Sequence, residues 1–163
     1  MKVKIKKLNE NAVIPFYATE GSAGMDLTAT SVHEDEYGNV VYGTGLAFEI
    51  PKGYVGLLFP RSSNSKKDLM LMNCVGVLDS DYRGEVTFKF RPIYHNVKNN
   101  LFWRFVNLFV EHKVVTFFNF GEYEVGDKIG QIVIIKHPKI EFVETDELSE
   151  TDRGVGGYGS TGK

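Results

Sequence analysis

Two carboxylates and a tyrosine stand close together in residues 73–86, which read Asn-Cys-Val-Gly-Val-Leu-Asp-Ser-Asp-Tyr-Arg-Gly-Glu-Val. Asp79 and Asp81 interrupt a run of strand-forming residues, and Tyr82 follows at once. A carboxylate at the end of a rigid strand is well placed to act as a general base. The pattern equally fits a β-hairpin whose aspartates supply only turn chemistry. Taken alone, this segment favours the turn interpretation, so the rest of the chain must decide.

Groups that could hold an anion stand on both sides of this segment. Residues 60–67 read Pro-Arg-Ser-Ser-Asn-Ser-Lys-Lys, and residues 151–163 form a glycine-rich tail with an arginine, a serine and a threonine. Backbone N–H groups can surround an anion where Cβ atoms are absent, and an arginine adds a bidentate charge. Tyr158, within the tail, could stack on a nucleobase. By itself such a tail is usually a disordered terminus.

Composition narrows the class of protein. The 163 residues suffice for one domain with a sizeable core, and the formal net charge is −2. A chain so close to neutral is not a general duplex-DNA binder. Its one cysteine, Cys74, excludes an intrachain disulfide and a multi-cysteine zinc site, and we expect it to pack as a small buried hydrophobe. The chain shows neither a signal-peptide core nor about 18 consecutive apolar residues, so we expect a soluble intracellular, for example cytoplasmic, protein without a membrane partner.

The elements that must position these groups are mostly short strands separated by turn residues. We expect a hairpin over 73–86, a short helical turn over 68–72, and strands near 3–5, 25–29, 40–50 with breaks at its glycines, 54–59, 86–90, 114–120, 127–135 and 140–143. This pattern is typical of an all-β barrel or sandwich.

One helix is expected, over residues 100–113. Leu101, Phe105, Leu108 and Phe109 recur at helical spacing and form one apolar face, which further aromatic and aliphatic residues widen. Such a helix either packs on the outer surface of the barrel or exposes an aromatic patch to a partner protein.

Five segments of the chain occur in a fixed order: Ala23-Gly-Met-Asp-Leu27, Pro60-Arg-Ser-Ser63, 73–86, 126–132 with Gln131, and 153–162. Together they closely resemble the five motifs of the trimeric dUTPase family, the dUTP diphosphatases. The resemblance runs from about residue 3 to residue 162, apart from an inserted segment at 93–115. It implies one domain over 1–163, a jelly-roll-like β barrel, and a homotrimer with active sites between subunits. A flexible arm, 151–163, would close a site that the other two subunits build.

By this resemblance the protein would hydrolyse dUTP at the α-phosphorus to dUMP and pyrophosphate, which limits uracil incorporation into DNA and supplies dUMP for thymidylate synthesis. Asp79 would be the general base that deprotonates the attacking water, and Tyr82 would pack against the deoxyribose. The remaining substrate-binding residues would contact the uracil edge (Asn73, Gly76, Val77, Leu78), the phosphate chain (Arg61, Ser62, Ser63, Gln131) and, from the arm, the γ-phosphate and uracil (Arg153, Tyr158, Gly159, Ser160, Thr161).

The resemblance also implies Mg²⁺, carried mainly by the triphosphate oxygens and largely hydrated. Asp26 is the candidate for an outer-sphere contact through water, and a purely structural role for it is equally open. Besides the inserted segment, the chain departs from the family pattern at two positions. Tyr158 stands where phenylalanine is usual, which preserves stacking, and Gly130 replaces the usual alanine before Gln131, which would loosen a strand.

Two other functions compete with dUTP hydrolysis. A dCTP deaminase would share the barrel and the triphosphate site, but that family needs a glutamate on the strand after 73–86, where this chain has Lys89. Alternatively the chain is an interaction module whose inserted helix, 100–113, binds a regulatory protein, with catalysis secondary. The presence of the set Asp79, Arg61, Gln131 and Arg153 favours hydrolysis.

Overall fold

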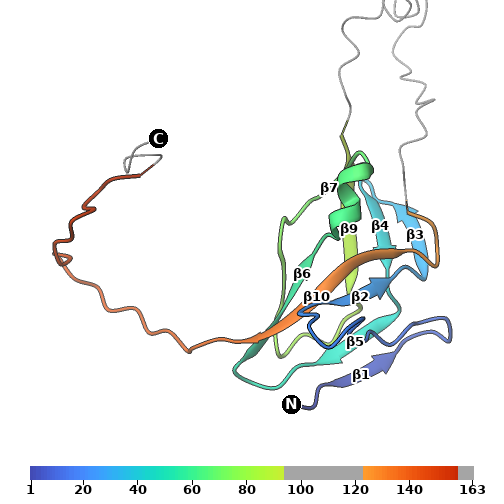
Figure 1. Cartoon of the computed structure of the whole chain (residues 1–163), viewed down its shortest axis with the longest axis horizontal. Coiled ribbons are helices and arrows are strands. Elements are labelled where there is room, and N and C mark those ends of the chain that lie inside the picture. The colour runs from blue at the N-terminus through green and yellow to red at the C-terminus, as the bar shows by residue number, and fades with distance from the viewer. Residues whose placement is uncertain (94–122, 158–163) are drawn as a thin grey trace, which may run out of the picture.

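The computed structural model describes residues 1–93 and 123–157 (Figure 1). Its elements are ten strands and one short 3₁₀ helix: β1 (Lys4–Lys7), β2 (Met25–Thr28), β3 (Ser31–Glu34), β4 (Val40–Gly43), β5 (Leu46–Glu49), β6 (Tyr54–Phe59), η1 (Ser62–Lys66), β7 (Leu69–Leu71), β8 (Gly76–Leu78), β9 (Thr87–Pro92) and β10 (Lys128–Lys136). The predicted helix 100–113 and strand 114–120 lie outside the described residues, as do Tyr158, Gly159, Ser160 and Thr161.

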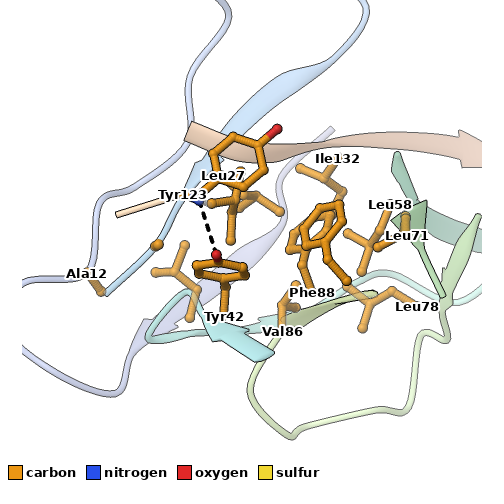
Figure 2. Close-up of a cluster of buried hydrophobic side chains, with 14 of the residues drawn as sticks. Ala12, Leu27, Tyr42, Leu58, Leu71, Leu78, Val86, Phe88, Tyr123 and Ile132 are labelled. Carbon is orange, nitrogen blue, oxygen red and sulfur yellow. Dashed lines mark hydrogen bonds between the residues drawn. The ribbon is translucent and has the colours of Figure 1, made fainter. Parts of the chain in front are cut away.

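Two four-stranded antiparallel sheets make up most of the described fold. One has the order β2-β10-β6-β8 and the other β3-β4-β9-β7, while β1 and β5 form a separate pair. Large side chains from both sheets fill the space between them, and Figure 2 shows Phe88, Leu58 and Ile132 meeting there beside Tyr42. The predicted all-β class is therefore confirmed. Among the described residues, no helix reaches the length needed to cross a bilayer.

The sheet that contains β6 and β10 has apolar residues on both faces. Ile132, Leu58 and Leu78 point into the core, and the alternate positions carry a second apolar set that faces away from it: Val55, Leu57, Phe59, Val77, Val133 and Ile135. Val77 is 65% exposed in the single chain. Strands that are apolar on both faces are typically covered on both sides.

The predicted hairpin over 73–86 is wrong. β8 pairs with β6, whereas β9 pairs with β4 and β7, so the two halves belong to different sheets. Residues 79–86 connect one sheet to the other, and at their end the Val86 N–H donates to the Leu46 carbonyl at 2.9 Å. An alternating pattern on each side of a turn specifies two strands, but it does not specify that they pair with one another.

Two smaller predictions are also wrong. Residues 69–71 form β7 instead of a helical turn, and the helical turn lies earlier, in η1. Cys74 is exposed, in a tight turn with φ +52°, because its N–H returns to the Leu71 carbonyl at 3.2 Å.

The expected strand over 140–143 is absent from the described part of the chain. Phe142 is 92% exposed and Val143 83% exposed, and the segment after β10 runs away from both sheets (Figure 1, orange to red). A strand needs a neighbour to satisfy its backbone groups, and this segment has left the sheets that could supply one.

Candidate functional site

Three elements bring four polar side chains together at one end of the β6-containing sheet. Gln131 of β10 lies opposite Asp26 of β2 and opposite Phe59 of β6, and the chain leaves β6 through Pro60 into Arg61. A register shift between Lys128 and Gly130 adds one residue to β10. We call the group of Asp26, Arg61, Lys128 and Gln131 the cationic corner.

Asp26 is the centre of the cationic corner. Arg61 Nε donates to Asp26 Oδ1 at 2.8 Å, and Lys128 Nζ lies 3.0 Å from Asp26 Oδ2. The side chain of Asp26 is 25% exposed and that of Arg61 is 33% exposed, so these ion pairs are partly screened from water. Partial burial raises the pKa of Asp26, but the hydrogen bonds and charges of Lys128 and Arg61 outweigh burial and hold it below its ordinary value of 3.8. Asp26 is therefore ionised at neutral pH.

Gln131 is held so that part of its amide faces outward. Its Nε2 donates to the Pro60 carbonyl at 3.1 Å, which uses one of its two N–H groups. Gly24 lies against the amide, and a Cβ at that position would stand 2.5 Å from Gln131 Oε1. The small residue in the Ala23-Gly-Met-Asp-Leu27 segment thus makes room for this glutamine.

Tyr123 packs against η1, the 3₁₀ helix that follows Arg61, and bonds to it. The Tyr123 hydroxyl donates to Asn64 Oδ1 at 3.2 Å, and its backbone N–H donates to the Tyr42 hydroxyl at 3.1 Å (Figure 2). Lys67 Nζ lies 4.5 Å from the centre of the same ring. Arg61 Nη1 donates to Ser63 Oγ at 3.3 Å, which links the guanidinium to η1.

Asp79 begins a turn whose carbonyl groups accept hydrogen bonds from the backbone and from the Arg83 side chain. The Tyr82 N–H donates to the Asp79 carbonyl at 3.2 Å, and Arg83 Nη1 donates to the carbonyls of Ser80 and Tyr82 at 2.8 Å each. Both Asp79 and Tyr82 are exposed to solvent. We call residues 79–85 the Asp79 turn.

Tyr82 lies over a glycine in the Asp79 turn. Its hydroxyl donates to the Glu85 carbonyl at 3.2 Å, and a Cβ on Gly84 would collide with the Tyr82 ring. The Glu85 carboxylate in turn accepts the Gly45 N–H at 2.7 Å. The tyrosine ring therefore stands in a fixed orientation although it is solvent-exposed.

Residues before the Asp79 turn present main chain to solvent. Gly76 and Leu78 are buried, whereas Asn73 and Val77 are exposed. A Cβ on Gly76 would stand 2.9 Å from Asn73 Nδ2 and 3.1 Å from Leu58 Cβ, so a larger residue there would displace the Asn73 side chain and crowd Leu58. Within the described sheet β8 is an edge strand, and its side facing away from β6 can bond a ligand.

The cationic corner and the Asp79 turn lie far apart in one chain. Leu78 pairs with Gly56, so Asp79 lies level with Val55, six residues before Arg61. Gln131 and Asp26 lie level with Phe59, four residues beyond Val55, so at about 3.3 Å per residue the two places are separated by about 13 Å along the sheet, on different strands. The remaining predicted anion donor among the described residues, Arg153, lies on the segment beyond β10 and donates to the Gly156 carbonyl at 2.9 Å.

Lys128 is a member of the cationic corner that sequence reasoning missed. It precedes Gln131 by three positions, and in a regular strand that spacing places two residues on opposite faces. The extra residue in β10 brings both to one face. Only a signal for the bulge, such as the glycine at Gly130, could have indicated this.

The residues of the cationic corner fit Mg²⁺ only as an ion that enters already bound to a ligand such as a triphosphate. Among the described residues, no three His, Cys, Asp or Glu side chains group as a metal site. Both carboxylate oxygens of Asp26 already contact cations. Magnesium prefers oxygen ligands and usually keeps several waters.

The family model for dUTPase matches residues 10–97 and 111–162. The chain belongs to the dUTPase family. The gap between the two matched ranges, residues 98–110 of this chain, falls inside the predicted inserted segment at 93–115.

Curated relatives of the dUTPase family match along the whole chain. The deoxyuridine 5'-triphosphate nucleotidohydrolase of Nautilia profundicola is 39% identical over 165 residues, which is 100% of each chain. The enzyme of the same name from Hydrogenobaculum sp. is 37% identical and covers 99% of each.

Solved dUTPase structures share the fold. The dUTPase of Staphylococcus bacteriophage 80alpha with dUPNHPP is 27% identical, covers 99% of each chain and superposes with a TM-score of 0.75. It was described in work on phage dUTPases that control transfer of virulence genes. A variant dUTPase from phage phi11 of S. aureus, described for its coordination of a structural Mg(II) ion, is 25% identical with a TM-score of 0.66, over 90% of this chain and 98% of that one.

Proposed function

We propose that this protein is a dUTP diphosphatase that hydrolyses dUTP at the α-phosphorus to dUMP and pyrophosphate. The observation that carries the proposal is the end-to-end match to deoxyuridine 5'-triphosphate nucleotidohydrolases. Such an activity limits uracil incorporation into DNA and supplies dUMP for thymidylate synthesis. Deamination is not supported, and Lys89 of β9 is paired with Asp35, just after β3, at 3.1 Å.

The cationic corner and η1 are the proposed binding site for the phosphate chain. Arg61 supplies N–H groups in a fork that matches phosphate oxygens, and Ser62 and Ser63 add hydroxyl donors. Gln131 contributes its second amide N–H. These groups are held before the substrate arrives, which reduces the entropy cost of binding.

The Asp79 turn is the proposed catalytic end of the site. Asp79 would accept a proton from the water that attacks the α-phosphorus, and its exposure leaves the carboxylate in reach of that water. Tyr82 would pack flat against the deoxyribose. Asn73 and the edge-strand backbone of Gly76, Val77 and Leu78 would bond the uracil edge.

A homotrimer with active sites between subunits completes this arrangement. Within one chain the phosphate donors and the base are about 13 Å apart along the sheet, which supports a second copy supplying one of the two sets. The apolar outward face around Leu57, Val77 and Val133 offers a contact surface for that copy.

The segment beyond β10 can reach a third copy. From it Arg153, Tyr158, Gly159, Ser160 and Thr161 would close over the γ-phosphate and the uracil, the last four being outside the described residues. The domain limits, 1–163 with an arm at 151–163, stay predictions.

Mg²⁺ would neutralise the triphosphate and fix its oxygens for attack. The protein groups beside it would be those of the cationic corner. The outer-sphere contact of Asp26 stays a prediction, and Asp26 would have to make it while holding two cations. A regulatory partner that binds helix 100–113 also stays a prediction, since that helix lies outside the described residues.

Pyrophosphate release from a panel of nucleotides tests the activity. We expect rapid release from dUTP and little from dTTP, dCTP and UTP. The same incubation with dCTP is assayed for ammonia. Ammonia release, or equal hydrolysis of all four nucleotides, would contradict the proposal.

Mixed oligomers test whether the site is shared between copies. Asp79→Asn and Arg61→Ala chains, each inactive alone, are co-expressed with different tags and the mixed species is isolated. If base and phosphate donors come from different copies, about a third of the sites in the isolated mixed trimers receive one intact set of each, because one of the three subunit junctions joins the two parents in the productive order. A site within a single copy would regain no activity.

A further inference from the structure

We propose that Lys128 and Asp26 are positioning residues that determine how Arg61 meets the triphosphate. Lys128 occupies one oxygen of Asp26, so that Asp26 holds Arg61 through Nε and leaves its outer N–H groups for the substrate. The inference deepens the proposed function and rests on it.

The distances within the cationic corner show an incomplete fork between Arg61 and Asp26. Arg61 Nε donates to Oδ1 at 2.8 Å, but Arg61 Nη2 is 3.5 Å from Oδ2, at the outer limit of a hydrogen bond. Lys128 Nζ lies closer to that second oxygen, at 3.0 Å. An arginine and a carboxylate without a competitor usually form two parallel bonds.

Because the fork is incomplete, several N–H groups of the Arg61 guanidinium remain available to a ligand. A guanidinium has five N–H groups, one on Nε and two on each Nη. Nε is bonded to Asp26, and one N–H of Nη1 is directed to Ser63 Oγ at 3.3 Å. The rest of the Nη edge can meet phosphate oxygens while Nε stays anchored.

The fold provides Lys128 for this purpose through the bulge in β10. Lys128 lies opposite Thr28 and Gln131 lies opposite Asp26, which places both on the face of β2 that carries Asp26. Without the extra residue, Lys128 would lie on the opposite face. The bulge thereby converts a strand lysine into a neighbour of the phosphate-binding arginine.

Charge and geometry make opposite predictions for Asp26. The three ionised groups sum to +1, and Asp26→Asn raises this to +2. If Asp26 acted only through its charge, the substitution would tighten the binding of an anionic ligand. If Asp26 positions Arg61, binding weakens, because Arg61 loses its anchor and the two cations repel.

The experiment uses the full-length protein and a non-hydrolysable imido analogue of dUTP. Asp26→Asn should weaken analogue binding about tenfold, roughly the loss of one charge-assisted hydrogen bond. Lys128→Met should raise KM for dUTP and weaken analogue binding by about fivefold to tenfold, with kcat within about twofold, and Lys128→Arg should restore both. The control is Lys4→Met. Lys4 of β1 is also paired with a carboxylate, that of Glu49 on β5, at 2.8 Å.

Several results would overturn the inference. Tighter analogue binding by Asp26→Asn would show that its charge alone matters. Unchanged binding by Lys128→Met would remove Lys128 from the mechanism. A raised Mg²⁺ requirement in Asp26→Asn, with analogue affinity in EDTA unchanged, would assign Asp26 to the metal. Failure of the unmodified protein to release pyrophosphate from dUTP would instead contradict the proposed function.

Discussion

Asp26 and Asp79 are aspartates at opposite ends of the same sheet, and the fold treats them differently. Asp26 is partly buried and bonded to two cations, while Asp79 is exposed at the start of a turn held by a backbone hydrogen bond and by the Arg83 side chain. A carboxylate that anchors an arginine must stay ionised and still, whereas one that accepts a proton must reach water. The comparison assigns positioning to the cationic corner and proton transfer to the Asp79 turn.

The largest expected effect is at the catalytic end. Asp79→Asn should lower kcat for dUTP by about 10³-fold or more, because the amide cannot accept the proton, while affinity for the imido analogue stays within about threefold. Pyrophosphate release and calorimetric titration measure the two quantities. Asp81→Asn, two residues on in the same turn, is the matched control and should remain near parental activity. If Asp79→Asn hydrolysed dUTP at the parental rate, proton transfer could not be assigned to the Asp79 turn.

Arg61→Lys probes the cationic corner with the charge retained. Lysine cannot anchor through one nitrogen and bind phosphate with others in a fixed plane, so affinity for the analogue should fall about tenfold to a hundredfold. Affinity for dUMP, which lacks the β- and γ-phosphates, should fall much less. Equal losses for both ligands would mean that Arg61 does not act on the distal phosphates.

Gly130→Ala tests how the core supports the cationic corner. A Cβ on Gly130 would collide with the Phe88 ring, so we expect destabilisation of about 1–3 kcal/mol and a higher KM through a displaced Gln131. Gly21→Ala is the control, since a Cβ there meets nothing within 4 Å, and its effect should stay within about 0.5 kcal/mol. The double variant Phe88→Leu/Gly130→Ala should recover stability in urea unfolding. Without recovery, the collision with Phe88 is not the cause.

The smallest effect concerns pH. The pKa of Asp26 is lowered from 3.8, so its ion pairs contribute fully above the unfolded value and lose their contribution as pH falls through the folded value. Since both partners are partly exposed, we expect the unfolding free energy of the parent to exceed that of Asp26→Asn by only about 1 kcal/mol at pH 7. The difference should shrink as pH falls from about 5 towards 2. A difference independent of pH would mean that the carboxylate charge is not what stabilises the corner.

The strands at 40–50 and 54–59 and the strand that contains Gln131 could be predicted because alternation and turn residues are local signals. The partner of β8 could not, since its residues fit a hairpin and an inter-sheet connection equally well. Cys74 was expected inside on residue type, but its tight turn places it outside. Ile140 to Val143 were expected in a strand, but no described strand of the same chain lies beside them.

The sequence by itself determined the chemistry of this protein, because residue types and their order along the chain carry it: an aspartate with a tyrosine after a strand, an arginine with serines, and a glutamine in a core strand. Tertiary structure alone decided which of these meet. Strand pairing put Asp26 beside Gln131, a one-residue bulge added Lys128, and register separated Asp79 from Arg61. The physical reason is that hydrogen bonds between strands join residues that are distant in sequence, and a shift of one residue reverses the face on which a side chain lies.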